Sequence, residues 1–393
     1  MIYLDNAATT KPCNAVLRGL TNIQESLWGN PGSKHIVGKM AKQQMDESRA
    51  SVAEMIGADP CNLVFTSGAT ESNNLAIQSW FNTHSYHGYE PVITSKVEHD
   101  SVRNTLGLLP LDKMIEINVD DSCSVDLGEL ESAIQECSAS CVANHGLISI
   151  MAVNNETGGI NDIGAISEIA HKYGWYTHFD CTQALETIDI NVKELDCDFA
   201  SFSSHKIYGL KGTGALYAKN ISDIHPMIHG GHNQEYGKRG GTENVLGMWA
   251  FATGCETVRS MRPTRMKRTE QFFDMFIRTL QKSFDNNHDK LGFFINGEHG
   301  LSKIINLRFD GIDGETLLTL LSEDGVCVSA GSACRSREDK PSHVLTALRL
   351  TPEQCRSSIR VSFSTYANTL DEMNEAAFKI AYYVSMLRGF NTN

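Results

Sequence analysis

Two side chains that lie far apart in the sequence could together carry out chemistry on an amino acid. Lys206 ends the run Ser-Ser-His-Lys at residues 203–206, and Cys334 follows a run of small residues at 329–333. A lysine amine can hold a carbonyl cofactor as a Schiff base, and a thiol in a loop can act as a nucleophile. This combination of residue types indicates sulfur chemistry.

The surroundings of both residues differ from those of ordinary surface groups. Lys206 is followed by a partly apolar stretch, residues 207–216, that glycines interrupt. Burial there would lower the pKa of the amine, which suits Schiff-base formation and later proton transfer. Cys334 is followed closely by Arg335 and Arg337, which favour the thiolate, so we predict a reactive cysteine. Cys327, between two valines, is predicted to be inert packing.

A short turn offers a site for a phosphate group. Residues 66–71, Thr-Ser-Gly-Ala-Thr-Glu, follow a predicted strand and open a predicted helix. Free backbone N–H groups at such a helix N-terminus favour an anion. Most turns of this kind bind nothing, so the motif is weak when taken alone. Ser203 and His205 could add hydrogen bonds to the same phosphate.

Three further polar side chains each have two interpretations. Asp180 could pair with the protonated nitrogen of a pyridine ring, or it could cap a turn. His99 could stack on a flat cofactor, or it could be a satisfied structural residue. Arg360 could grip an amino-acid carboxylate, with Asn155 adding a neutral hydrogen bond in the same pocket, or it could form a buried ion pair. The residues alone leave these alternatives open.

Short apolar strands alternate with amphipathic helices over the first two-thirds of the chain. The pattern predicts strands at 62–66, 91–94, 147–153, 175–179 and 199–203, with helices between them, for example at 71–81 and 163–173. This rhythm is typical of a mostly parallel sheet in an α/β fold. Ligands of such sheets bind beyond the carboxyl ends of the strands, where the polar clusters lie.

The texture of the sequence changes after about Cys255, where a stretch rich in arginine and lysine begins. We predict a large domain at 15–256 and a smaller α+β domain made of residues 1–14 and 257–393. The smaller domain would contain strands at 303–309 and 358–364 and the cysteine loop at about 326–342.

Charge and cysteine content limit the possible partners and compartments. The net charge of -13 disfavours direct binding of nucleic acid, because the field of the protein would repel a polyanion. The 11 cysteines are scattered, as in reduced cytoplasmic proteins, and Cys137 with Cys141 lacks a second pair of metal ligands. No apolar run reaches the length of a membrane span, so we expect a cytoplasmic, soluble protein without a resident metal.

The ordered set of motifs resembles one family, the cysteine desulfurases of the NifS/IscS type within the class V aminotransferase group. The resemblance runs through nearly the whole chain. It is carried by residues 3–10, 29–33, 67–74, 154–156, 178–183, 203–206, 239–244 and 332–334.

The resemblance implies a homodimer of fold-type I architecture, with a seven-stranded type of sheet and pyridoxal 5'-phosphate as cofactor. It implies Lys206 as the Schiff-base lysine, Asp180 on the ring nitrogen, Gln183 on the ring hydroxyl and His99 stacked on the ring. The implied phosphate contacts are Ala69, Thr70, Ser203, His205 and, from the neighbouring subunit, Thr242. It also implies that Arg360 and Asn155 bind the substrate carboxylate.

The implied reaction removes sulfur from L-cysteine and gives L-alanine and a persulfide on Cys334, which passes the sulfur to a protein acceptor. The destination could be iron–sulfur assembly, tRNA thiolation or DNA phosphorothioation, and Cys334 could transiently ligate a cluster. His232 and Asn233, Cys181 and the short tail depart from the commonest family pattern. Alternatives are a selenocysteine lyase or other class V enzyme, and a sulfur carrier without catalytic activity.

Overall fold

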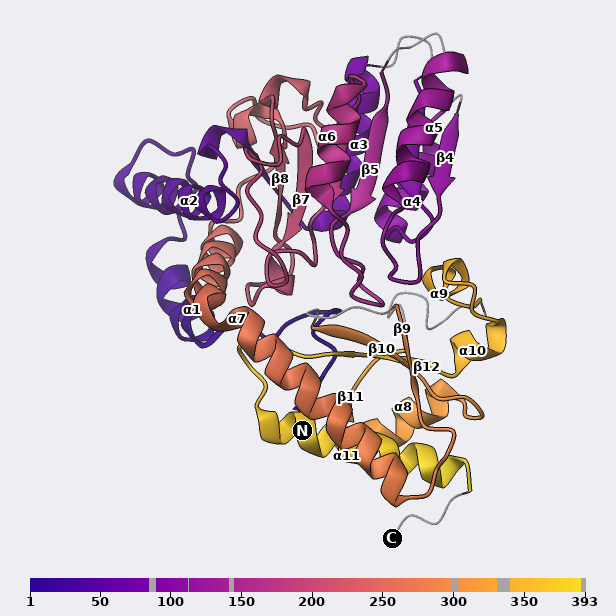
Figure 1. Ribbon diagram of the computed structural model, residues 1–393. Coiled ribbons are helices and arrows are strands. Elements are labelled where there is room, and N and C mark those ends of the chain that lie inside the picture. Colours follow the sequence, from indigo (N-terminus) through magenta and orange to yellow (C-terminus); the bar gives the residue numbers. More distant parts are fainter. Residues whose placement is uncertain (85–89, 112, 141–144, 298–302, 331–339, 390–393) are drawn as a thin grey trace.

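A seven-stranded sheet forms the centre of the larger part of the molecule (Figure 1). The computed structural model describes residues 1–84, 90–111, 113–140, 145–297, 303–330 and 340–389. β8 is antiparallel to both of its neighbours and the other pairs are parallel, so the predicted mostly parallel sheet is confirmed. In sheet order the strands are β2 Leu63–Thr66, β8 Gly214–Ala218, β7 Phe199–Ser203, β6 Tyr176–Asp180, β5 Leu147–Met151, β3 Val92–Ser95 and β4 Met114–Ile117.

Helices cover both faces of this sheet, which explains why its central strands are apolar without alternation. Val92 and Leu147 pack on one face with α3 and α4, whereas the next residues, Ile93 and Ile148, pack on the other face with α2, α5 and α6. The helices are α1 Asn14–Ser26, α2 Ile36–Met55, α3 Ala69–His84, α4 Asp100–Leu108, α5 Leu127–Ser140 and α6 Ile163–Lys172. Short 3-10 helices lie at η1 Pro60–Asn62, η2 Ser204–Lys206, η3 Ile221–Asp223 and η4 Gln234–Gly237.

The smaller part of the molecule has its own sheet and its own hydrophobic core. Its antiparallel sheet has the order β12 Ser358–Ser362, β10 Ile304–Arg308 and β9 Phe294–Asn296, and β1 Ile2–Tyr3 pairs in parallel with β11 Val326–Cys327. Its helices are α8 Gly314–Glu323, α9 His343–Ala347, α10 Pro352–Arg356 and α11 Leu370–Leu387. Its core brings residues 2 and 4 of the N-terminus together with residues 272–384.

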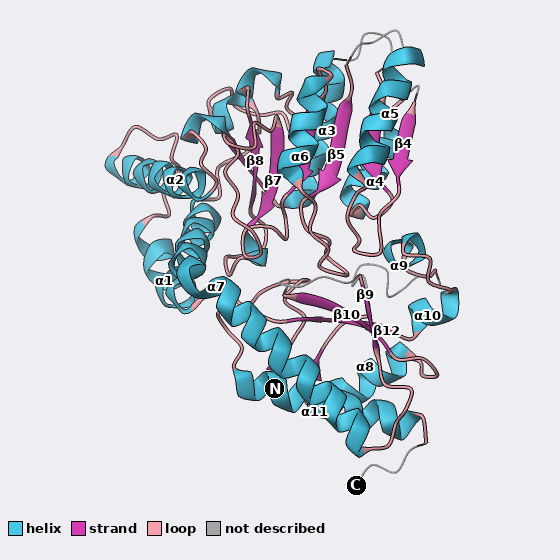
Figure 2. Cartoon of the chain, in the orientation of Figure 1, coloured by secondary structure: helices cyan, strands magenta, loops and turns pink. Residues whose placement is uncertain are grey.

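The long helix α7, Val245–Asn286, connects the two parts (Figure 2). Asn244 caps it by accepting a hydrogen bond from the Gly247 amide at 3.0 Å. Its first turns pack in the larger core, and its residues from Phe272 onward pack in the smaller core. The predicted boundary at 256/257 therefore falls inside a continuous helix. We propose the same division into 15–256 and 1–14 with 257–393, as two cores that share one helix.

The predicted strands lie within one or two residues of the observed ones, with one instructive difference. The strand expected at 147–153 ends at Met151, and Val153 instead forms an isolated bridge with Ile160. β8 was not predicted, because the glycines around it read as a loop. No helix in the described ranges is both long enough and apolar enough to cross a membrane.

Candidate active site

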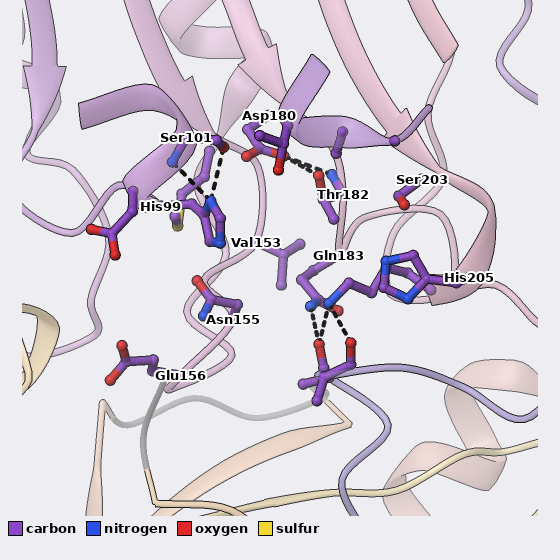
Figure 3. A pocket seen from close by; sticks show the side chains of 18 of the residues that line it. His99, Ser101, Val153, Asn155, Glu156, Asp180, Thr182, Gln183, Ser203 and His205 are labelled. Carbon is purple, nitrogen blue, oxygen red and sulfur yellow. Dashed lines mark hydrogen bonds between the residues drawn. The ribbon is translucent and has the colours of Figure 1, made fainter. Parts of the chain in front are cut away.

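A cavity of about 410 Å³ opens at the carboxyl ends of the central strands, between the two parts of the molecule. The side chains of His99, Asn155, Asp180 and Gln183 surround one space there (Figure 3). The remaining predicted residues that line it are Ala69, Thr70, Ser203, His205, Lys206 and Arg360. The structure thus brings together predicted residues from six separate segments of the chain.

The two remaining predicted site residues are Thr242 and Cys334. Thr242 lines a neighbouring smaller cavity, which shares Ser67 and Gly212 with the first. Cys334 lies outside the described residues, as does most of the predicted cysteine loop. The roles assigned to both remain predictions.

Lys206 ends the short helix η2, directly after β7. Its Nζ donates hydrogen bonds to the backbone carbonyls of Ala7 at 2.5 Å and Ala8 at 2.9 Å. Burial lowers the pKa of this amine to about 8, and the positive charges of Arg360 and Lys303 act in the same direction. A substantial fraction of the amine is therefore neutral near neutral pH, as a nucleophilic or proton-accepting lysine requires.

Asp180 is the last residue of β6 and is buried. One carboxylate oxygen accepts from the Asn73 side-chain amide at 2.8 Å, and the other accepts from the Thr182 backbone amide at 3.0 Å and from the Thr182 hydroxyl. It therefore caps a turn, which was one alternative, while also lining the cavity, as the other requires.

His99 caps the N-terminus of α4 and also lines the cavity. The Ser101 backbone amide donates to its Nδ1 at 3.1 Å, so in the neutral ring the hydrogen is on Nε2. The two interpretations of this residue are again compatible, because a ring that is held by the backbone can present its face to a ligand.

Arg360 lies within β12 and is 2% exposed. One terminal nitrogen donates to the Asn155 carbonyl at 2.8 Å, and the other pairs with Asp5 at 2.7 Å. The buried ion pair that the sequence left open is thus present. The guanidinium nevertheless lines the cavity beside the Asn155 side chain.

The predicted phosphate turn lies at the start of α3, where Ala69 and Thr70 begin the helix. The Ser203 hydroxyl beside it is buried and has no hydrogen-bond partner within the part of the chain that the structure covers, and the same holds for Oε1 of Gln183. Burial, together with the charges of Lys206 and Lys211, lowers the pKa of His205 to about 4, so it can give an anion a hydrogen bond but no charge.

Several contributors to the site were not found from the sequence. Asn73 and Thr182 hold Asp180, Asp5 holds Arg360, and the N-terminal carbonyls hold Lys206. All of these residues lie in segments quoted for the resemblance, at 3–10, 67–74 and 178–183, which was the visible signal. Glu98 is fully buried next to His99, and burial raises its pKa to about 8.

The family model described as aminotransferase class-V matches residues 2–374. The chain belongs to this family. It is 37% identical to the protein named cysteine desulfurase IscS from Dictyoglomus turgidum, over 98% of this chain and 95% of that protein. A solved NifS-like protein superposes with a TM-score of 0.85 at 32% identity, covering 98% of this chain and 99% of the other. A solved structure of SspA in complex with cysteine superposes at 0.76 with 30% identity, covering 93% and 99%.

These similarities confirm the predicted family, the fold-type I architecture and pyridoxal 5'-phosphate as the cofactor. The residues present fit that group. Two buried polar atoms, on Ser203 and Gln183, have no protein partner among the described residues, and both lie in the wall next to the N-terminus of a helix and a buried carboxylate. Such atoms are costly to bury unless a ligand completes their hydrogen bonds.

The low pKa of Lys206 gives the first prediction. In the cofactor-free protein, an amine reagent should label Lys206 half-maximally near pH 8, because deprotonation creates the reactive form. Exposed lysines should reach half-maximal labelling about two pH units higher. Mass spectrometry of labelled peptides over a pH series measures both. A Lys206 midpoint above pH 10 would contradict the burial argument.

The second prediction concerns Gly214 in β8. A Cβ there would come within 2.6 Å of the Gly68 backbone and of the Phe202 carbonyl, so Gly214→Ala must displace the phosphate turn. We expect pyridoxal 5'-phosphate affinity to fall by about tenfold or more, measured by absorbance titration of the apoprotein. Gly107→Ala is the control, because a Cβ at this exposed helical glycine meets nothing within 4 Å and affinity should not change.

Proposed function

We propose that this cysteine desulfurase removes sulfur from L-cysteine with Lys206 as its proton-transfer residue and Cys334 as its sulfur acceptor. The observation that carries the proposal is the cavity that is lined both by a lysine whose pKa is lowered to about 8 and by a buried arginine. The names of the curated relatives confirm the predicted activity class, in preference to a selenocysteine lyase or a carrier without catalytic activity.

The residues that would hold the cofactor are those lining the strand ends. Asp180 would face the ring nitrogen, Gln183 the ring hydroxyl and His99 the ring face. Ala69, Thr70, Ser203 and His205 would hold the phosphate. When bound, pyridoxal phosphate supplies a reactive aldehyde and an electron sink for the bonds at the α-carbon.

Arg360 and Asn155 would orient the substrate by its carboxylate. The Arg360 guanidinium is already held by two protein oxygens, so it loses little conformational freedom when it binds a substrate carboxylate. It is therefore preorganised. Lys206 Nζ, held by two backbone carbonyls, would take the α-proton of the substrate while neutral.

The thiolate of Cys334 would attack the substrate sulfur. The new sulfur–sulfur bond forms as the carbon–sulfur bond breaks, so that L-cysteine and the enzyme thiol give L-alanine and the enzyme persulfide. A protein acceptor then takes the sulfur, and the acidic net charge disfavours direct delivery to nucleic acid. The cytoplasm, where thiols stay reduced, is the compartment that we propose.

We also propose a homodimer in which Thr242 of one subunit completes the phosphate site of the other. What supports this is the position of Thr242, which is exposed and lines a second cavity that adjoins the first at Ser67 and Gly212. An exposed hydroxyl at the edge of a phosphate turn is suitably placed to serve a neighbouring chain.

The third prediction tests the sulfur acceptor. Cys334→Ala should keep the yellow colour of the bound cofactor and still change its spectrum on addition of L-cysteine, but sulfide release should fall by about 100-fold or more, because no thiolate receives the sulfur. Sulfide is measured in the presence of a reductant. Cys61→Ala, at an exposed cysteine, is the matched control and should release sulfide normally. Wild-type release by Cys334→Ala would refute the role of this thiol.

The fourth prediction tests the shared site. Thr242→Val and Lys206→Ala should each be impaired, but mixing and reassembling the two should restore about a quarter of wild-type turnover, because half of the dimers then contain one native site. No recovery in the mixture would show that Thr242 serves its own chain.

A further inference from the structure

A buried polar network lies behind the cavity and joins the two parts of the molecule. One oxygen of Glu186 accepts hydrogen bonds from the Tyr208 hydroxyl and from Thr365 at 3.3 Å, and its other oxygen pairs with Lys303. The Tyr208 hydroxyl also lies 2.7 Å from the Ser364 hydroxyl. All five side chains are buried, and none of them lines the cavity.

Burying an ion pair removes two charges from water, so such a pair contributes little net stability compared with apolar packing. Its distinctive property is directional, because each partner must meet the other in one arrangement to avoid an unpaired buried charge. The position of this network in the chain therefore matters more than its strength.

At one end, the network holds the turn that carries Lys206. Tyr208 follows two residues later with a φ of 67°, a left-handed conformation that residues with a Cβ rarely adopt. Its backbone amide donates to the Thr10 hydroxyl at 2.7 Å and its carbonyl accepts from the Cys13 amide at 2.9 Å. A strained turn persists only where its surroundings fix it, and the bond to Glu186 is part of that fixation.

At the other end, the network holds the strand pair that carries Arg360. Lys303 directly precedes β10, and Ser364 and Thr365 closely follow β12. In this strand pair Ile304 lies opposite Ser362 and Asn306 lies opposite Arg360. The network therefore holds both strands at the same end of the pair.

We propose that Glu186, Tyr208 and Lys303 are positioning residues that set the placement of Lys206 relative to Arg360. The inference rests on the proposed function, in which one residue binds the substrate carboxylate and the other takes the adjacent α-proton. These two groups of an amino acid are one bond apart, so an error of about 1 Å between the two side chains misplaces the proton.

Tyr208→Phe tests the proposal, because it keeps the ring packing and removes only the bonds to Glu186 and Ser364. We expect kcat/KM for L-cysteine to fall by about tenfold with normal cofactor content. Tyr366→Phe is the control. The ring of Tyr366 packs against that of Tyr208 with 5.0 Å between their centroids, but its hydroxyl accepts from the Asn14 amide and does not join the network. The loss of this hydroxyl should therefore change kcat/KM by less than about twofold.

A double-mutant cycle distinguishes positioning from simple destabilisation. When Arg360→Gln has removed the carboxylate contact, the placement of Lys206 relative to residue 360 no longer affects the reaction. In that background Tyr208→Phe should therefore lower kcat/KM by less than a further factor of about three. A full tenfold loss in that background, or wild-type kcat/KM in Tyr208→Phe alone, would overturn the proposal.

A measurement without substrate or cofactor separates this inference from the proposed function. In apo Tyr208→Phe, the midpoint pH of Lys206 labelling should rise by about half a unit or more, because a loosened turn exposes the amine to water, and it should not change in Tyr366→Phe. An unchanged Lys206 labelling midpoint in Tyr208→Phe would contradict the proposed positioning role of the network. Absence of sulfide release by the wild-type enzyme would instead refute the proposed function and leave this readout intact.

If Tyr208→Phe does not fold, the paired change Glu186→Gln with Lys303→Met serves in its place. It removes both charges together and leaves neither buried without a partner. Because the charge of Lys303 itself helps to lower the pKa of Lys206, the readout for this pair is kcat/KM alone. The same tenfold loss is expected, and a wild-type kcat/KM would overturn the proposal.

Discussion

The catalytic architecture depends on keeping one amine buried and yet partly neutral. Lys206 achieves this with two backbone carbonyls of the N-terminal segment as acceptors, and with cations rather than additional carboxylates dominating its charged surroundings. Carbonyl oxygens satisfy the amine hydrogens without fixing a proton as strongly as a paired carboxylate would. A direct partner such as Asp or Glu at the same place would hold the lysine in its charged form.

The cavity is assembled from two parts with different tasks. The large sheet ends in side chains suited to a flat anionic cofactor, whereas β12 of the smaller sheet contributes the arginine suited to a carboxylate. Because helix α7 passes through both cores without interruption, the two parts share one continuous helix. The polar network around Glu186 adds a second connection close to the chemistry.

Much of this could be predicted from the sequence, and the omissions have a common physical origin. Strand ends at Thr66, Asp180 and Ser203 follow from local apolar runs and the polar residues after them, so the cofactor edge of the cavity was visible. The bond from Asn73 to Asp180 and the pair between Asp5 and Arg360 join segments more than 100 residues apart, which no local pattern encodes. The continuity of helix α7 across the proposed boundary at 256/257 was hidden for a related reason, since a change of core leaves the periodicity of a helix unchanged.

The first ten residues make several contacts whose partners are encoded much later in the chain. Ile2 pairs with Val326, Asp5 with Arg360, and Ala7 both accepts from Lys206 and donates to Ser362. During synthesis, the N-terminal segment leaves the ribosome first, but it can form its native contacts only after strand β12 has been made. The amine of Lys206 thus acquires its acceptors and its lowered pKa only when nearly the whole polypeptide has been made.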